Sequence, residues 1–212
     1  MRQDVRVFRW EVMSALADQK VLGIVRARSA DEAVELSRRL LGAGLRCVEV
    51  AFTTPGAAQA LRTVTAQAPA DAVVGAGTVL SAVDAAAAVE AGARFLVAPD
   101  LSEEVVAAAH HHGVPVMPGV GSVTELRRAL RLGAAAAKLF PAAHFGPAWL
   151  RDVRAALPNV PVVPTGGVTA ESVPDWLAAG AVACGLGSWL TGGDDATAAE
   201  RVRQVLAAAD RR

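Results

Sequence analysis

The chain has 212 residues, of which 53% are hydrophobic and 20% are charged, and its 21 basic and 21 acidic residues give a formal net charge of zero. This hydrophobic fraction is sufficient for a large core and excludes an intrinsically disordered chain. The balanced charge, with no long basic run, argues against nucleic acid or an anionic membrane as a partner.

The cysteines and the N-terminal segment indicate the cellular compartment of the protein. Cys47 and Cys184 are the only cysteines, and each lies in an apolar run, which predicts two buried, reduced thiols. The N-terminus leads into no apolar run of the signal-peptide type, and the sequence has no uncharged apolar stretch of about 18 residues. We therefore expect a cytoplasmic protein.

Short apolar segments alternate with helical segments along the chain. An N-terminal helix is expected over about residues 4–19. In the first half, strands are expected at residues 21–26, 47–52, 72–76 and 95–99. Ser29 and Glu32 have the spacing of a capping box, so a helix should begin there and end near the glycines at 42 and 44. The other helices of this half are expected at about residues 55–68, 81–92 and 102–113.

The second half repeats the pattern. Strands are expected at residues 114–118, 136–140, 160–164 and 181–185, and helices at about residues 122–133, 147–157, 170–180 and 194–209. Ser122 and Glu125 form a second capping-box signature. Eight strands, each followed by a helix, are the pattern of a (β/α)₈ TIM barrel. We expect an α/β fold in which residues 1–212 form a single barrel domain.

An open doubly wound sheet is the alternative, because it is also built from alternating strands and helices. The chain has no Gly-x-Gly-x-x-Gly after its first strand, and its polar residues lie at the ends of strands throughout the sequence. A barrel gathers those ends on one face, which favours the closed fold. The residues expected at this face are Arg26, Glu49, Thr53, Thr54, Thr78, Pro99, Lys138, Thr165, Gly166, Gly167, Gly187 and Ser188.

Lys138 lies near the end of an apolar run, and Lys20 is the only other lysine in the chain. Arginine is always protonated, whereas a lysine amine can lose its proton when it is desolvated and can then attack a carbonyl group. The sequence therefore indicates a nucleophilic lysine. The alternative is a lysine that caps a strand end and extends into solvent.

Glu49 is a carboxylate in the middle of another apolar strand. Such a group loses several kcal/mol of solvation unless it is paired. If Glu49 points into a barrel, Lys138 is its natural partner, and the carboxylate could act as a general acid/base through a water molecule. The alternatives are a purely structural ion pair and a salt bridge with Arg46.

Glycine-rich turns follow the last two predicted strands, at residues 165–167 and 185–188. Barrels of this kind hold phosphate groups there on backbone N–H groups, and glycine allows the backbone to approach the anion closely. The alternative is that these glycines only form turns. Thr78, after the third predicted strand, would place a hydroxyl group at the same pocket.

The histidines and tryptophans receive no functional assignment. His110, His111 and His112 are consecutive, so on a helix they point in different directions and should not bind one metal ion together. Trp10, Trp149, Trp176 and Trp189 are expected to be packing residues.

Six short motifs together resemble the 2-keto-3-deoxy-6-phosphogluconate (KDPG)/4-hydroxy-2-oxoglutarate (KHG) aldolase family. The resemblance runs in order over about residues 21–190. The motifs are Glu49-Val50, Val-Gly-Ala-Gly-Thr-Val-Leu at 74–80, Met-Pro-Gly at 117–119, Lys-Leu-Phe-Pro at 138–141, Pro-Thr-Gly-Gly at 164–167 and Gly187-Ser188.

The resemblance implies a class I, Schiff-base aldolase, which is a lyase of the Entner–Doudoroff type of carbohydrate metabolism. It would cleave KDPG or a similar 2-keto-3-deoxy acid to pyruvate and an aldehyde such as glyceraldehyde 3-phosphate. No metal or cofactor is implied, and the expected assembly is a homotrimer. The same chemistry on 2-keto-3-deoxy-6-phosphogalactonate or 4-hydroxy-2-oxoglutarate is one alternative. A phosphosugar epimerase and a non-catalytic phosphosugar-binding barrel are others.

The resemblance also implies roles for individual residues. Lys138 matches the Schiff-base lysine, Glu49 the acid/base carboxylate and Thr78 a contact to the pyruvyl carboxylate. The residues that match the imine-packing, substrate and phosphate contacts are Phe140, Thr165, Gly166, Gly167 and Ser188. One position differs, because the best-known members have an arginine for the pyruvyl carboxylate where this chain has Thr53. A related subfamily has that arginine at the end of the first strand, as Arg26 is here.

Overall fold

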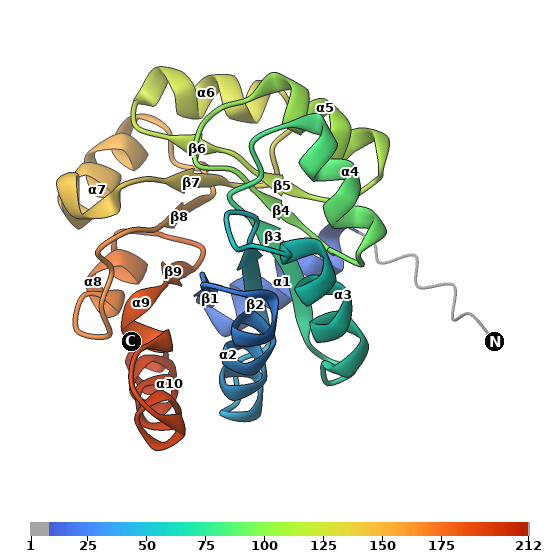
Figure 1. The fold of residues 1–212 in the computed structure, drawn as a ribbon. Coiled ribbons are helices and arrows are strands. Elements are labelled where there is room, and N and C mark those ends of the chain that lie inside the picture. The colour runs from blue at the N-terminus through green and yellow to red at the C-terminus, as the bar shows by residue number, and fades with distance from the viewer. Residues whose placement is uncertain (1–8, 212) are drawn as a thin grey trace.

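Within residues 9–211, which the computed structural model describes, nine short parallel strands curl around a common axis (Figure 1). The strands are β1 Val21–Val25, β2 Cys47–Ala51, β3 Val73–Gly77, β4 Leu96–Val97, β5 Val116–Met117, β6 Gly119–Val120, β7 Ala137–Leu139, β8 Val162–Pro164 and β9 Cys184–Leu186. Six of them pair in the order β5-β4-β3-β2-β1-β9, and the others in the order β6-β7-β8.

Helices cover the outside of the strands (Figure 1). They are α1 Arg9–Gln19, α2 Ala30–Gly42, α3 Ala57–Gln67, α4 Ala82–Glu90, α5 Glu103–His111, α6 Val123–Arg131, α7 Gly146–Ala156, α8 Val173–Ala178, α9 Ser188–Thr191 and α10 Asp195–Asp210, with a 3₁₀ turn η1 at Ala142–His144. The predicted N-terminal helix is confirmed from Arg9 onwards, and residues 4–8 lie outside the described part of the chain.

Two seams join the strand groups into one barrel. An isolated bridge between Thr165 and Gly185 links the end of β8 to β9, and β5 continues into β6 through Pro118. Counting β5 and β6 as one broken strand gives the eight strands of a TIM barrel. The predicted fold class is therefore confirmed, and the alternative prediction of an open doubly wound sheet is wrong.

The predicted fifth strand, residues 114–118, is wrong in its extent. Only Val116 and Met117 of it form a strand, β5, which pairs with β4. A separate strand, β6, follows beyond the predicted range and pairs with β7. Pro118 lies between them and has no N–H group to donate to a ladder, which explains the break. Gly119 then passes so close to the carbonyl of Pro99 that a Cβ atom would clash with it. The eighth predicted strand also begins too early, because pairing with β1 starts at Cys184.

Both predicted capping boxes are confirmed. Ser29 Oγ accepts a hydrogen bond from the Glu32 N–H at 3.2 Å, and the Glu32 carboxylate accepts one from the Arg28 N–H at 2.6 Å. Ser122 and Glu125 repeat this arrangement at the start of α6, at 3.2 Å. These caps satisfy N–H groups at helix starts, and so fix where each helix begins after its strand.

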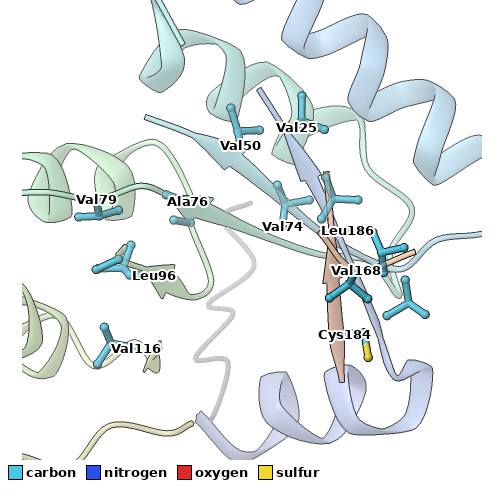
Figure 2. Packing of buried hydrophobic residues seen from close by; sticks show 14 of the residues in the cluster. Val25, Val50, Val74, Ala76, Val79, Leu96, Val116, Val168, Cys184 and Leu186 are labelled. Atoms are coloured by element: carbon cyan, nitrogen blue, oxygen red, sulfur yellow. The ribbon is translucent and has the colours of Figure 1, made fainter. Parts of the chain in front are cut away.

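The apolar residues form two layers, because successive strand residues point to opposite faces. One layer lies between the strands and the helices, and Figure 2 shows part of it, including Val25, Val50, Leu96 and Leu186. The other fills the barrel interior and is shared with α1, whose Val12 and Leu16 pack against it. The residues of this interior layer that lie on the strands or immediately before one include Leu22, Cys47, Val73, Phe95, Met117 and Val163. Helix α1 therefore covers the amino ends of the strands, and their carboxyl ends remain for a site.

None of the helices within residues 9–211 is long and apolar enough to span a bilayer.

Candidate active site

A cavity of about 590 Å³ opens at the carboxyl ends of the strands. Eight of the predicted site residues line it: Arg26, Lys138, Phe140, Thr165, Gly166, Gly167, Gly187 and Ser188. They come from both ends of the sequence and meet here because parallel strands place all their carboxyl ends on one face of a barrel.

Lys138 is held in the wall of this cavity by β7. It lies in register with Gly119 of β6 and Val163 of β8, and only 6% of its surface is exposed. Its Nζ atom lies 5.2 Å from the centroid of the Phe140 ring. Lys138 is therefore a nearly buried amine that reaches the cavity beside an aromatic face, and the predicted alternative of a strand-end lysine extending into solvent is wrong.

Glu49 is fully buried in the barrel interior, in register with Ile24 of β1 and Gly75 of β3. Neither of its carboxylate oxygens has a hydrogen-bond partner among the described residues. Burial raises the pKa of this carboxyl group, while the positive charges of Lys138 and Arg26 oppose that increase. The carboxyl group thus has the isolation and the altered proton affinity that are enriched at catalytic sites.

The proposed salt bridge between Glu49 and Arg46 is wrong, because Arg46 pairs with Asp71 on the outside of the barrel. Space for the carboxylate comes instead from Gly77. A Cβ atom on Gly77 would lie 2.7 Å from Glu49 Cδ and closer still to Oε1. The second glycine of the Gly-Ala-Gly-Thr motif is therefore required by the packing of Glu49.

Arg26 and Thr78 flank the strand that carries Glu49. Arg26 follows β1 and Thr78 follows β3, and the Arg26 Nη2 group donates a hydrogen bond to Thr78 Oγ1 at 3.3 Å. Thr78 has a φ of 54°, which is unusual for a β-branched residue, and residues with such strained backbones cluster at functional sites. This bridge places the Thr78 hydroxyl group beside the guanidinium group of Arg26, and of these two residues only Arg26 lines the cavity.

Thr53 and Pro99 are not part of the cavity wall. Thr53 is exposed in the turn after β2, while the neighbouring Thr54 is buried and accepts a hydrogen bond from the Ala27 N–H at 3.2 Å. Pro99 is half-buried, and its carbonyl group packs against Gly119. Thr54 thus has a structural role in joining the loops after β1 and β2.

The two glycine-rich turns follow β8 and β9, and β9 pairs with β1, the strand that precedes Arg26. Gly166 and Gly167 have φ values of 89° and 79°, and a Cβ atom on Gly167 would lie 2.5 Å from the Ala143 Cβ. In the part of the chain that the structure describes, the N–H groups of Gly166, Gly167 and Ser188 donate to no backbone carbonyl. They are therefore available to an anion in the cavity.

Several wall residues were not predicted. Trp189 was expected only to pack, but it lines the cavity as well as contacting the core. Ile24, Val168, Thr169 and Thr191 also line it, as does Gly185 of the predicted glycine turn. Val168, Thr169 and Thr191 lie within a few residues of the predicted glycine turns, and Ile24 lies two residues before Arg26. This proximity was a usable signal, although the residue types indicated only packing.

The histidine run shows no metal-binding geometry. Across residues 9–211, no group of three or more His, Cys, Asp or Glu side chains is arranged to hold a metal ion. The His110 Nε2 atom lies 3.2 Å from the Gly133 carbonyl oxygen, which fits a role in joining α5 to the end of α6.

Comparison with known proteins adds an independent observation. A family model described as KDPG and KHG aldolase matches residues 12–205. A 2-dehydro-3-deoxy-phosphogluconate aldolase from Treponema pallidum is 40% identical over 181 residues, which are 84% of this chain and 85% of the relative. A KHG/KDPG aldolase from Escherichia coli is 35% identical over 182 residues, 85% of each chain.

A solved structure from Legionella pneumophila is also similar to this chain. It is a KDPG aldolase with pyruvate captured at low pH as a covalent carbinolamine intermediate. It has a TM-score of 0.79 and 29% sequence identity, and the match covers 93% of this chain and 96% of that one.

Proposed function

Because the chain belongs to the KDPG and KHG aldolase family and is therefore a lyase, we propose that it cleaves KDPG, or a similar phosphorylated 2-keto-3-deoxy acid. The products would be pyruvate and an aldehyde such as glyceraldehyde 3-phosphate. The observation that carries this proposal is the nearly buried Lys138 amine in the cavity wall, across the barrel from a buried carboxylate with no hydrogen-bond partner among the described residues.

In the proposed mechanism, the free-base amine of Lys138 attacks the C2 ketone of the substrate. Loss of water gives a protonated imine, which can accept the electron pair of the C3–C4 bond. Glu49 removes the proton of the C4 hydroxyl group, the C3–C4 bond breaks and the aldehyde leaves. The remaining enamine takes a proton at C3, and hydrolysis of the imine releases pyruvate and the amine.

Glu49 is proposed to act through a bridging water molecule. Among the described residues, it has no direct hydrogen bond. Burial raises the pKa of Glu49, which makes its carboxylate a stronger base than an exposed one and suits it to take up a proton.

Two groups of residues at the cavity suit the two ends of the substrate. Arg26, supported by Thr78, would bind the pyruvyl carboxylate, since a guanidinium group offers two parallel donors to a carboxylate. The free N–H groups of Gly166, Gly167 and Ser188, with Gly187, would bind the phosphate. Phe140 would pack beside the imine, and Thr165 would contact the substrate between these two ends.

The test is the release of pyruvate, measured with lactate dehydrogenase as the coupling enzyme. KDPG, its galactonate epimer and the unphosphorylated 4-hydroxy-2-oxoglutarate should be compared. We expect the highest kcat/KM with a phosphorylated substrate. Equal efficiency with 4-hydroxy-2-oxoglutarate would mean that the glycines form turns only, and no cleavage of any of the three would contradict the proposed activity.

Three further expectations accompany this proposal. Residues 1–212 would form one domain, the chain would assemble as a homotrimer, and it would work in the cytoplasm, where Cys47 and Cys184 stay reduced. Light scattering after size-exclusion chromatography measures the assembly. A monomer at micromolar concentration would contradict the trimer without affecting the proposed chemistry.

A further inference from the structure

The short helix α9 forms one side of the cavity, yet it has little internal support. It has four residues, of which Ser188, Trp189 and Thr191 line the cavity. Its amides make three bonds to the preceding turn, from Leu190 to the Gly187 carbonyl at 2.8 Å, from Thr191 to the same carbonyl at 3.3 Å, and from Gly192 to the Ser188 carbonyl at 3.0 Å. A single helical turn is not stable by itself, because its nucleation entropy exceeds the gain from so few bonds. Its position must be fixed by other contacts.

One of these contacts is apolar. Leu190 is fully buried and belongs to the layer between the barrel and its helices. Leu190 anchors the middle of α9, and the partly buried Trp189 contacts the same layer. Neither apolar contact satisfies the carbonyl groups at the carboxyl end of the turn, which therefore need a second, polar contact.

Arg201 of α10 provides that second contact. Its Nη1 group donates to the carbonyl oxygens of both Trp189 and Gly192 at 2.8 Å. Its guanidinium carbon also lies 5.6 Å from the centroid of the Trp189 ring. A cation at the carboxyl end of a helix satisfies free carbonyl groups and opposes the negative end of the helix dipole. The stacking on tryptophan adds a cation–π interaction.

Arg201 does not line the cavity itself, so it can influence the site only through α9. We propose that Arg201 is a positioning residue for phosphate binding, which holds α9 so that the Ser188 N–H group and the Trp189 side chain keep their places in the wall. The proposal rests on the proposed function, in which this wall binds the phosphate. The effect on phosphate binding should exceed that on Schiff-base formation, because α9 packs against β1 and α10, whereas Lys138 lies on β7.

The experiment compares Arg201→Ala, Arg201→Lys and a control, Arg203→Ala. Arg203 lies on the same helix and pairs with Glu200 at the surface. We expect Arg201→Ala to raise KM for the phosphorylated substrate about tenfold or more, with kcat within about threefold of the wild type. Arg201→Lys should recover part of the loss, since lysine keeps the charge but can neither stack nor hold two carbonyls in one plane. Arg203→Ala should behave as the wild type.

A second readout separates this proposal from its premise. Borohydride trapping of pyruvate needs no phosphate, so its rate should be unchanged in both Arg201 variants. If the wild type traps no pyruvate, the proposed function fails, and this inference with it. If the wild type traps pyruvate but KM for the phosphorylated substrate is unchanged in Arg201→Ala, only the positioning role is overturned.

If Arg201→Ala slows borohydride trapping by the same factor by which it raises KM, Arg201 has a general structural role, and the proposal is also overturned. Should Arg201→Ala fail to fold, as judged by circular dichroism, the same comparison is made with Arg201→Lys. A wild-type KM in that folded variant would contradict the need for the planar guanidinium.

Discussion

Glu49 and Lys138 reach the barrel interior from opposite sides (Figure 1). When β5 and β6 are counted as one strand, β2 is the second and β7 the sixth of the eight barrel strands. The Lys138 charge is the larger of the two influences that oppose the raised pKa of Glu49, ahead of Arg26. The two groups are therefore coupled electrostatically without a direct hydrogen bond to the carboxylate among the described residues. An amine and a carboxyl group so placed can act on opposite sides of one bound molecule.

Glu49→Gln should stabilise the fold at neutral pH. Burial raises the pKa of Glu49 above 4.5, so the folded chain binds this proton more tightly than the unfolded chain does. Its contribution to stability is therefore fully present below about pH 4.5 and is lost as pH rises toward the raised value. The free energy of unfolding in urea should be higher for the variant by more than about 1 kcal/mol at pH 8, and the difference should shrink toward pH 4.5.

Glu200→Gln is the matched control for this pH dependence. Glu200 is exposed and pairs with Arg203, which lowers its pKa, so its removal should not stabilise the fold as pH rises. A constant difference between Glu49→Gln and the wild type from pH 4.5 to pH 8 would contradict a buried, desolvated carboxylate.

The same Glu49→Gln variant should lose turnover. Without the carboxylate, no group removes the C4 hydroxyl proton, and general acid/base catalysis typically contributes about 100-fold or more to the rate. Steady-state kinetics should show the loss in kcat, with KM changed little. Retention of the wild-type kcat would remove Glu49 from the proposed mechanism.

Arg26→Ala should weaken pyruvate binding and lower kcat/KM by about 100-fold, or about 3 kcal/mol. The reason is the loss of the charge-assisted bond to the pyruvyl carboxylate, which the neutral Thr78 hydroxyl cannot replace. Introducing Thr53→Arg into that variant should restore part of the affinity.

Arg28→Ala is the control, because Arg28 is exposed and pairs with Glu32 at the start of α2. Pyruvate affinity is measured, without borohydride, from the rise in melting temperature at several pyruvate concentrations. If Arg26→Ala binds pyruvate as the wild type does and only its pH profile shifts, Arg26 serves to balance the charge of Glu49.

Gly77→Ala should inactivate the protein and destabilise it by about 1–3 kcal/mol, since a new Cβ atom would overlap the Glu49 carboxylate. Gly42→Ala is the comparison, because a Cβ atom on Gly42 would meet nothing within 4 Å at the end of α2. That change should leave activity intact and stability equal or higher. Differential scanning calorimetry and kcat/KM test both, and an active Gly77→Ala protein would show that Glu49 can move without consequence.

Much of the barrel was predictable from the sequence because its signals are local. Capping residues such as Ser29 and Ser122 mark helix starts, and glycines mark helix ends, so the number and order of elements follow from the pattern. Counting the strands also predicts that Lys138 and Glu49 meet in the interior, since both lie in strands whose carboxyl ends share a face.

The remaining features depend on contacts between distant segments. The break in the fifth barrel strand follows from Pro118 and from the different pairing partners of β5 and β6. No local sequence pattern specifies those partners. The position of Trp189 in the cavity wall depends on how α9 is held. The contacts that hold α9 come from Arg201 on the next helix, α10. The need for glycine at position 77 appears only when the direction of the Glu49 side chain is known.

The most direct measurement of the central claim is the reduction of the protein with sodium borohydride in the presence of pyruvate, followed by peptide mass mapping. We predict the gain of one reduced pyruvyl group on the peptide that contains Lys138, its absence in Lys138→Arg, and its retention in Lys20→Arg, which alters the only other lysine of the chain. Lys138→Arg should remain folded but inactive. An adduct on Lys20, or an unchanged adduct and activity in Lys138→Arg, would contradict the assignment of Lys138 as the nucleophile.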